Sequence, residues 1–228
     1  VTALTLTSAA STITGDGCYT GASTAVITGT TAVPCNAART TERDNAVTAV
    51  NGQACTPLGG GAVNLNLVNL GGGLGPGVFP PGCYSSGGAM GVSAGTVTLS
   101  GAGVYIFRPT GTLTTAAGTT MAVTGGACES NVFWAPTGAT TLGANTTFKG
   151  TILDSANAVT VLNAATMIGR ILAPTGTITL GGGNTITRPP TCTTAPPVPI
   201  PTLSEWALIA FAMLIAGFGL FKQRQRRG

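Results

Sequence analysis

Threonine side chains recur at a fixed spacing in the second half of the chain. Each offers one hydroxyl, which can donate and accept hydrogen bonds, and one methyl group. Such groups, evenly spaced on a flat surface, can order water into a lattice-like array, which is binding chemistry rather than catalysis. Two sets follow one another at intervals of 19 residues: the first threonine column is Thr141, Thr160 and Thr179, and the second threonine column is Thr147, Thr166 and Thr185.

These threonines belong to a repeat that covers residues 137–186. Residues 139–142 align with 158–161 and with 177–180, and residues 150–153 align with 169–172. A fixed period near twenty, with short β-prone runs separated by glycines, indicates a solenoid. Three strands of about five residues plus corners fill such a period. The sequence therefore predicts a mostly β protein, a triangular β-helix.

Alternation within the repeat predicts which side chains face outward. Val159 and Val161 flank Thr160, and successive side chains on a strand point to opposite faces. The members of a column would then lie about 4.8 Å apart, the spacing of neighbouring strands. Thr137, Asn157 and Thr175 are expected to flank the first threonine column. The alternative is that threonine serves only as a soluble β-former.

Two alanines and one earlier segment also bear on the repeat. Ala122 is expected to interrupt the first threonine column, and Ala165 lies near the second. One repeat earlier, Phe133 and Trp134 align with Ile152 and Leu153.

Charge is scarce and uneven. Only 7% of the residues are charged, against about 25% in an ordinary globular protein. Four of the ten basic residues lie in the last seven positions, which leaves six basic and five acidic residues before the tail. Recognition of nucleic acid needs clustered lysine and arginine on one face. We therefore expect no nucleic-acid partner.

Six cysteines are widely spaced, and the chain has no histidine and no CxxC motif. Zinc-ligand spacing is therefore absent, and we expect neither a metal site nor a cofactor. An even number of cysteines in an exported chain favours disulfides, whose pairing the spacing leaves open. A Cys35–Cys55 bridge is disfavoured, because a helix of about 24 Å would separate the two residues and a bridge tolerates about 7 Å between Cα atoms.

One helix is predicted over about residues 36–51. Asn36 can cap it, the run that follows lacks glycine and proline, and Gly52 can end it. Ala46, Val47 and Val50 share one face with Arg43, so this face is expected to lie against the solenoid wall.

The end of the chain differs in composition from the body, which we place at residues 1–188. Residues 189–202 form a Pro/Thr-rich, extended linker. Residues 203–228 form a tail with an apolar run from Ala207 to Phe221, and the 19 positions of 203–221 are just enough to cross a bilayer. Trp206 at an interface and the basic end at the cytoplasmic side predict a transmembrane helix that holds the body outside the cytoplasm.

The body resembles the DUF3494 ice-binding-like family. The segments that carry the resemblance are Gly-Val-Tyr-Ile-Phe-Arg (103–108), Asn-Val-Phe-Trp (131–134), the run 141–153 and Gly-Arg-Ile-Leu-Ala (169–173). The resemblance implies a right-handed, discontinuous β-helix with an α-helix packed alongside. It also implies ice binding through a face that differs between members.

The tail resembles the IPTL-CTERM sorting signal. Its motif stands here as Ile200, Pro201, Thr202 and Leu203. The resemblance implies a sorting enzyme as a partner and a location in the bacterial cell envelope or outside the cell.

Enzymatic activity is not expected. The six carboxylates are scattered singly, and no nucleophile elbow, P-loop or dinucleotide fingerprint occurs in its required context. Ice binding by a surface-tethered or released protein is the leading hypothesis, with ice as the partner. The alternative is a structural or adhesive surface protein that uses the same scaffold without ice activity.

Overall fold

The computed structural model describes residues 3–6, 11–18, 26–29, 31–32, 37–154, 157–173 and 176–192. The chain divides into two compact units, residues 1–192 and 193–228. Thr175, the sorting motif from Ile200 to Leu203 and the predicted membrane segment 203–221 lie outside the described residues. Among the helices in the described ranges, none combines the length and apolar character needed to span a membrane.

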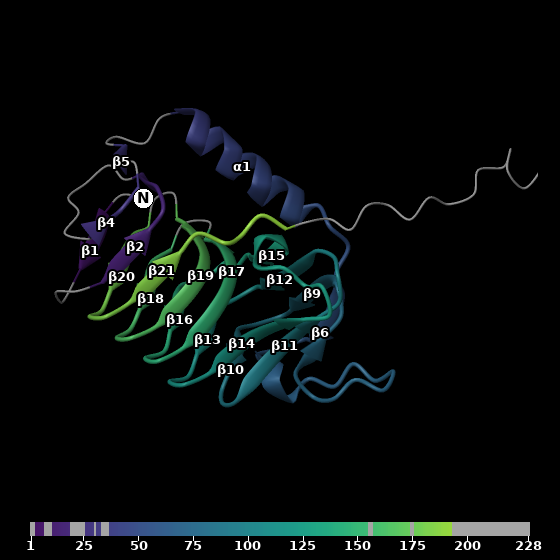
Figure 1. Cartoon of the computed structure of the whole chain (residues 1–228). Coiled ribbons are helices and arrows are strands. Elements are labelled where there is room, and N and C mark those ends of the chain that lie inside the picture. Colours follow the sequence, from purple (N-terminus) through teal and green to yellow (C-terminus); the bar gives the residue numbers. More distant parts are fainter. Residues whose placement is uncertain are drawn as a thin grey trace, which may run out of the picture. The chain divides into compact units, whose positions relative to one another are not determined.

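The first unit is a β-solenoid of parallel strands, as the 19-residue repeat predicts (Figure 1). One side, which we call the first face, is a seven-stranded sheet. In spatial order its strands are β7 (Val63–Asn64), β10 (Met90–Val92), β13 (Leu113–Thr115), β16 (Thr140–Leu142), β18 (Val159–Val161), β20 (Thr177–Leu180) and β1 (Ala3–Leu6).

A larger sheet wraps around the other two sides. We call the side that follows the first face in each coil the second face, and the remaining side the third face. The second face contains β8 (Val78–Phe79), β11 (Thr96–Ser100), β14 (Thr120–Thr124), the first halves of β17 (Thr147–Leu153) and β19 (Thr166–Leu172), β21 (Thr185–Thr187), β2 (Thr12–Thr14) and β4 (Val26–Ile27). The third face contains β6 (Thr56–Gly59), β9 (Gly82–Ser86), β12 (Tyr105–Pro109), β15 (Val132–Trp134) and the second halves of β17 and β19. Two 3-10 turns, η1 (Leu65–Leu67) and η2 (Glu129–Asn131), and a small pair, β3 (Gly17–Cys18) with β5 (Thr31–Ala32), complete the elements.

The long strand β17 turns from the second face to the third at Gly150. This residue has φ of 107°, a value that side-chain-bearing residues rarely adopt, and a Cβ there would lie 2.7 Å from the Val132 side chain. Glycine at this point lets one strand serve two faces without a loop.

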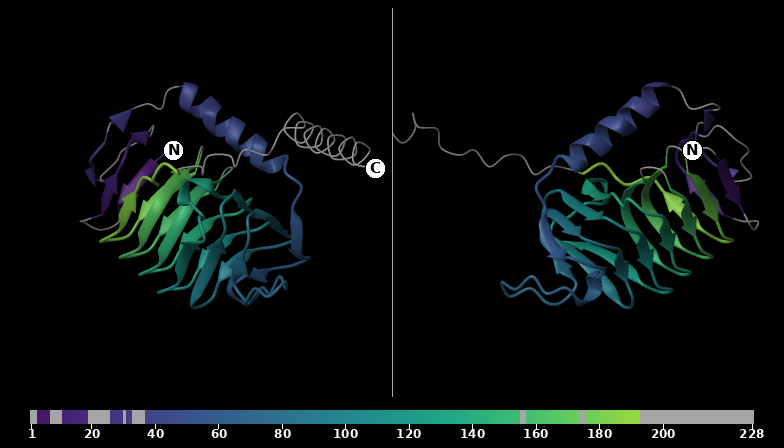
Figure 2. Two further views of the ribbon diagram at one scale, coloured as in Figure 1. Left: turned by 45° about the vertical axis from the view of Figure 1, so that its right-hand side comes forward. Right: turned by 180° about the vertical axis from the view of Figure 1, so that it is seen from behind.

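The order of the coils in space differs from their order in the chain. Strand β1 pairs with β20, and β2 pairs with β21, so the N-terminal strands extend the C-terminal end of the solenoid (Figures 1 and 2). Strand β4 pairs with β2 at this same end, and the solenoid strand that follows it in the chain, β6, pairs with β9 at the opposite end. The solenoid is therefore discontinuous, and its first face spans six strand spacings, or about 29 Å.

The helix α1 (Ala37–Asn51) carries the chain back along the solenoid. Its 15 residues span about 22 Å, most of the length between the two ends. Val50 is buried in a cluster with Ile106, Ala135 and Leu153, and Ala46 and Val47 pack against that cluster. The predicted apolar stripe thus covers the third face, which leaves the first and second faces uncovered by any described element.

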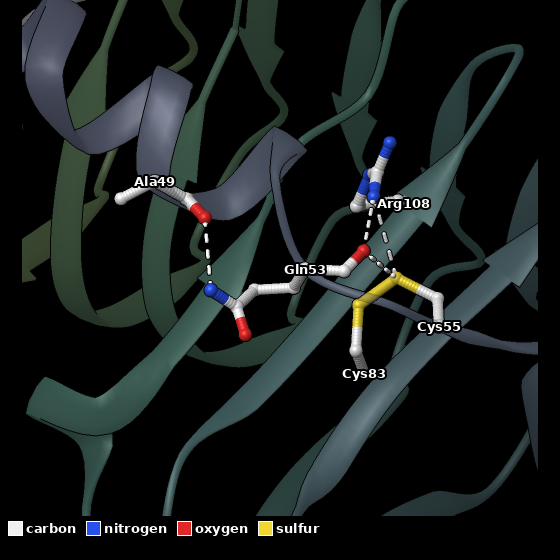
Figure 3. The surroundings of a disulfide bond; sticks show 5 residues. All are labelled: Ala49, Gln53, Cys55, Cys83 and Arg108. Carbon is white, nitrogen blue, oxygen red and sulfur yellow. Dashed lines mark hydrogen bonds between the residues drawn. A yellow bond between two sulfur atoms is a disulfide. The ribbon is translucent and has the colours of Figure 1, made fainter.

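A cluster of polar contacts and one disulfide fix the end of α1 to the third face (Figure 3). The Gln53 side chain donates from Nε2 to the carbonyl of Ala49, 3.2 Å away, and satisfies one of the free carbonyls at the helix end. Arg108 Nη1 donates to the Gln53 carbonyl at 3.0 Å. Cys55, bridged to Cys83, joins the segment after the helix to β9.

Two disulfides lie within the described residues: Cys55 is bridged to Cys83, and Cys128 is bridged to Cys192. The expectation of disulfides is confirmed for these two pairs, and Cys55 is not paired with Cys35.

The core contains a ladder of stacked rings on the inner side of the third face. Tyr84, Phe107 and Trp134 occupy neighbouring strands, with ring centroids 5.4 Å apart for the first pair and 4.3 Å for the second. The predicted alignment of Phe133 and Trp134 is wrong by one residue, since they pair with Thr151 and Ile152. The bend at Gly150 displaces the register between the two sides of β17, and alignment of identical letters does not reveal it.

Candidate functional site

The first threonine column lies in register on the first face. Thr141 is opposite Thr160, and Thr160 is opposite Thr179. The structure extends this column at both ends, to Thr114 on β13 and Thr5 on β1. Beyond Thr114 the same position is held by Gly91 and Asn64, where the column ends.

The second threonine column lies in register on the second face and is longer. Thr147, Thr166 and Thr185 are opposite one another, and the column continues without interruption through six strands. Its members are Thr96, Thr120, Thr147, Thr166, Thr185 and Thr12. Five strand spacings give it a length of about 24 Å. Thr96, Thr166, Thr185 and Thr12 are exposed, and Thr120 and Thr147 are half-buried.

The sequence analysis missed five of these eleven threonines for identifiable reasons. Thr114, Thr96 and Thr120 precede the regular repeat, in coils whose corners are longer than the 19-residue period allows. Thr5 and Thr12 come from the opposite end of the chain and join the columns only because the solenoid is discontinuous. The strand pattern Thr-Ile-Thr at β2, which matches Thr-Ile-Thr at β21, is the signal that could have found Thr12.

The expected interruption of the first threonine column by Ala122 does not occur. Ala122 lies opposite Thr98 on the second face, away from the first threonine column. Ala165 directly precedes Thr166 and is 1% exposed, so its methyl group points into the core. Both threonine columns are therefore more regular than the sequence indicates.

A second outward column runs beside the second threonine column, two residues further along each strand. It contains Thr98, Ala122, Lys149, Ile168, Thr187 and Thr14. Residues two apart on one strand are separated by about 6.6 Å, and strands by about 4.8 Å. The second face thus presents a two-dimensional array of small hydroxyl and methyl groups.

Buried polar side chains fix the corner between the first and second faces. Each is the residue directly before a member of the second threonine column. Thr146 Oγ1 donates to the carbonyl of Ala116 at 3.1 Å. Asn184 accepts from the amide of Ala165 at 2.8 Å and donates to the carbonyl of Gly181 at 3.0 Å. Ser11 donates to the same carbonyl at 2.6 Å. These bonds join successive coils and hold the two faces at a fixed angle.

The predicted flanking residues lie at the edge of the first face. Asn157 donates from Nδ2 to the carbonyl of Thr137, 2.7 Å away, and its amide donates to Asp154 Oδ1 at 2.6 Å. Thr137 is exposed, whereas Asn157 is half-buried and its side-chain amide already serves to join two coils. Thr175, the third predicted member, lies outside the described residues.

Lys149 is the one charged member of the two outward columns on the second face. Its Nζ lies 2.7 Å from Glu129 Oε1, in the turn η2. Burial raises the pKa of Glu129, but hydrogen bonds from Lys149 and from the Glu129 backbone, with the charge of Lys149, outweigh that effect and leave the pKa below its ordinary value. The Glu129 carboxylate is therefore ionised at neutral pH.

Among the described residues, no three histidine, cysteine, aspartate or glutamate side chains group in a way that could hold a metal ion. The chemistry that the two faces offer is that of regular arrays of hydroxyl and methyl groups.

Known proteins are similar to this chain in sequence and fold. Residues 2–187 match the model of the Ice-binding-like family, and residues 198–227 match the IPTL-CTERM motif. An ice-binding protein of Flavobacterium frigoris is 35% identical over 132 residues, which are 57% of this chain and 46% of that protein. An ice-binding protein of Flammulina populicola is 35% identical over 108 residues, which are 47% of this chain and 43% of that protein. The chain thus spans less than half the length of these two relatives.

Solved structures agree with the sequence relatives. The crystal structure of an ice-binding protein from the Antarctic ascomycete Antarctomyces psychrotrophicus superposes with a TM-score of 0.70 and 27% identity, over 83% of this chain and 93% of that one. The crystal structure of an ice-binding protein from an Antarctic biological consortium superposes with a TM-score of 0.69 and 28% identity, over 83% of this chain and 85% of that one. Over residues 2–187 the chain therefore belongs to the Ice-binding-like family, and it carries an IPTL-CTERM motif after that domain.

Proposed function

We propose that this protein binds ice through its threonine columns, with the second face as the main contact and the first face as the other candidate surface. The observation that carries the proposal is the uninterrupted column of six threonines from Thr96 to Thr12. The second face adds three more outward threonines, Thr98, Thr187 and Thr14, and so offers the larger array. We propose binding and no catalysis, in keeping with the names of the relatives.

The physical argument rests on regularity and low charge. A rigid array holds water molecules at repeated positions without the entropy loss that flexible side chains would add, because β-branched side chains have few rotamers. The corner bonds of Thr146 and Asn184 keep the array flat from coil to coil. Water ordered on such a surface can then merge with the ice lattice.

Thermal hysteresis and ice-recrystallisation inhibition test this proposal, and substitutions locate the face. Thr166→Tyr places a bulky ring in the middle of the second threonine column, and Thr160→Tyr does the same on the first. We expect Thr166→Tyr to reduce hysteresis severalfold while the melting temperature of the protein changes little, because an outward strand position accepts an aromatic residue within about 0.5 kcal/mol.

A matched control is Thr48→Tyr on the exposed side of α1, far from both columns. It should leave hysteresis unchanged. Loss of activity with Thr160→Tyr alone would move the site to the first face. A wild-type protein that shows neither hysteresis nor recrystallisation inhibition would refute ice binding, and the structural or adhesive role would replace it.

We also propose that the protein is exported and held at the cell surface through residues 203–221, with Ile200–Leu203 as the motif that a sorting enzyme reads. The match to the IPTL-CTERM motif over residues 198–227 supports this location. For the solenoid we propose a right-handed sense, which almost all crossovers between parallel strands of one sheet adopt.

A further inference from the structure

Lys149 belongs to the second outward column of the second face, so an unpaired ammonium there would be exposed on the proposed ice-binding surface. It follows Thr147 by two residues on β17, so its side chain leaves the strand on the same side as the second threonine column. Its neighbours in the second outward column are Ala122 and Ile168, which are small or apolar. No other member of the two columns on the second face is charged.

The ammonium group does not extend into solvent over the array. Nζ is bound to Glu129 at 2.7 Å, and the side chains of Lys149 and Glu129 are only 18% and 12% exposed. The pair is thus held at the side of the sheet, against the turn η2.

Both partners are anchored by independent contacts. Cys128, the residue before Glu129, is bridged to Cys192, and Ser130 donates to the carbonyl of Pro190. The indole Nε1 of Trp134 donates to the backbone carbonyl of Lys149 at 2.9 Å. The carboxylate therefore has a fixed position from which to hold the lysine, a requirement for an effective charge pair.

An unpaired lysine would disturb the array. Its ammonium is a compact, strongly hydrated charge on a flexible four-carbon stem. Such a group orients water around itself rather than in the pattern of the neighbouring threonines, and its mobile chain sweeps over them.

We propose that Glu129 is a positioning residue of the ice-binding surface: it draws the Lys149 ammonium aside and so keeps the second face free of exposed charge. This inference rests on the proposed function, since it assigns a role in ice binding to a residue outside the array.

The test uses Glu129→Gln and the double variant Glu129→Gln/Lys149→Gln in the full-length chain. The first readout is the reactivity of Lys149 toward an amine-directed acetylating reagent, measured by peptide mass spectrometry. Lys222, the other lysine of the chain, serves as the internal reference. We expect Glu129→Gln to raise the labelling of Lys149 relative to Lys222 severalfold.

The second readout is thermal hysteresis. Glu129→Gln should lower it severalfold, and the double variant, which has neither charge, should restore it. A purely structural role of the ion pair would lower the melting temperature in both variants and would give no restoration of hysteresis in the double variant.

The two readouts separate the possible failures. Unchanged labelling of Lys149 in Glu129→Gln would overturn the positioning role whether or not the protein binds ice. Increased labelling with unchanged hysteresis in an active protein would overturn its importance for ice binding. An inactive wild type refutes the proposed function and with it this role in ice binding, and the labelling then shows only whether Glu129 holds Lys149.

Discussion

The indole of Trp134 lies parallel to the ring of Phe107, with 12° between the planes, and at the same time donates to the carbonyl of Lys149. Trp134 is fully buried. One side chain therefore joins the stacked core of the third face to the strand that carries Thr147 and Lys149. The second face depends on this contact, because β17 bends at Gly150, directly after the carbonyl that Trp134 holds.

Trp134→Phe should destabilise the domain by about 1–3 kcal/mol. The smaller ring leaves a cavity in the core, and the buried carbonyl of Lys149 loses its donor. Denaturant unfolding followed by circular dichroism measures the change. A matched control is Phe133→Leu on the other side of the same strand, which keeps an apolar group under α1 and should cost less. Equal losses for both variants would contradict the importance of the indole hydrogen bond.

Thr140→Val should stabilise the protein by about 1–2 kcal/mol. Thr140 is fully buried in the inward column between Leu113 and Val159, and its hydroxyl has no hydrogen-bond partner in the described structure. Valine has the same shape without the cost of an unsatisfied polar group.

The control for this change is its outward neighbour, Thr141→Val, which should leave the free energy of unfolding nearly unchanged. Thermal denaturation of the two variants measures the difference. A loss of stability in Thr140→Val would show instead that the Thr140 hydroxyl is hydrogen-bonded in the folded protein.

Acidification should remove a contribution of Glu129 to stability. Its pKa in the folded protein lies below the ordinary value of 4.5, so folding favours the ionised form. The contribution is complete above pH 4.5 and declines as the pH falls from there through the folded pKa. The melting temperature of wild type should therefore fall more steeply below pH 4.5 than that of Glu129→Gln. Parallel pH profiles for the two proteins would show that the Lys149–Glu129 pair adds nothing.

The full-length chain should partition with membranes, whereas a chain that stops after Cys192 should stay in solution. Residues 203–221 contain the apolar run 207–221 and are of sufficient length to span a bilayer. Ending at Cys192 rather than Arg188 keeps Cys128 paired. Sedimentation of membranes followed by immunoblotting measures the partition. Leu214→Arg, which places a charge near the middle of the segment, should release the full-length chain. An intact full-length chain found in the soluble fraction would exclude the membrane anchor.

The sequence predicts the regular part of the solenoid well. Where coils have equal length, as from Thr141 to Thr185, a sliding alignment finds the strands, the inward valines and the outward threonines together. The helix is also predictable, since the run from Ala37 to Asn51 lacks breakers and its stripe of Ala46, Val47 and Val50 lies against the third face as expected.

The coils of unequal length were not predictable in the same way. Strands β10 to β15 precede the regular repeat, and their register depends on corners of unequal length, such as the turn η2 before β15, rather than on similarity of sequence. The predicted partner of Phe133 was wrong by one position because of the bend of β17 at Gly150.

Long-range order was beyond the sequence as well. Thr12 lies beside Thr185 because α1 carries the chain from one end of the solenoid to the other. No local pattern in the sequence indicates that pairing. The disulfides and the Lys149–Glu129 pair likewise join residues brought together by the coil geometry.

The bridge between Cys128 and Cys192 also determines how the molecule bears mechanical load. It joins two cysteines that are 64 positions apart in the sequence, and the covalent loop that it closes contains Thr141, Thr160 and Thr179 as well as Thr147, Thr166 and Thr185. A pull on the chain beyond Cys192 passes directly across the bridge to Cys128, instead of drawing β21 out of the sheet. The coils within the loop therefore cannot unfold one after another from that end. A force applied to the tail would leave these six threonines in register.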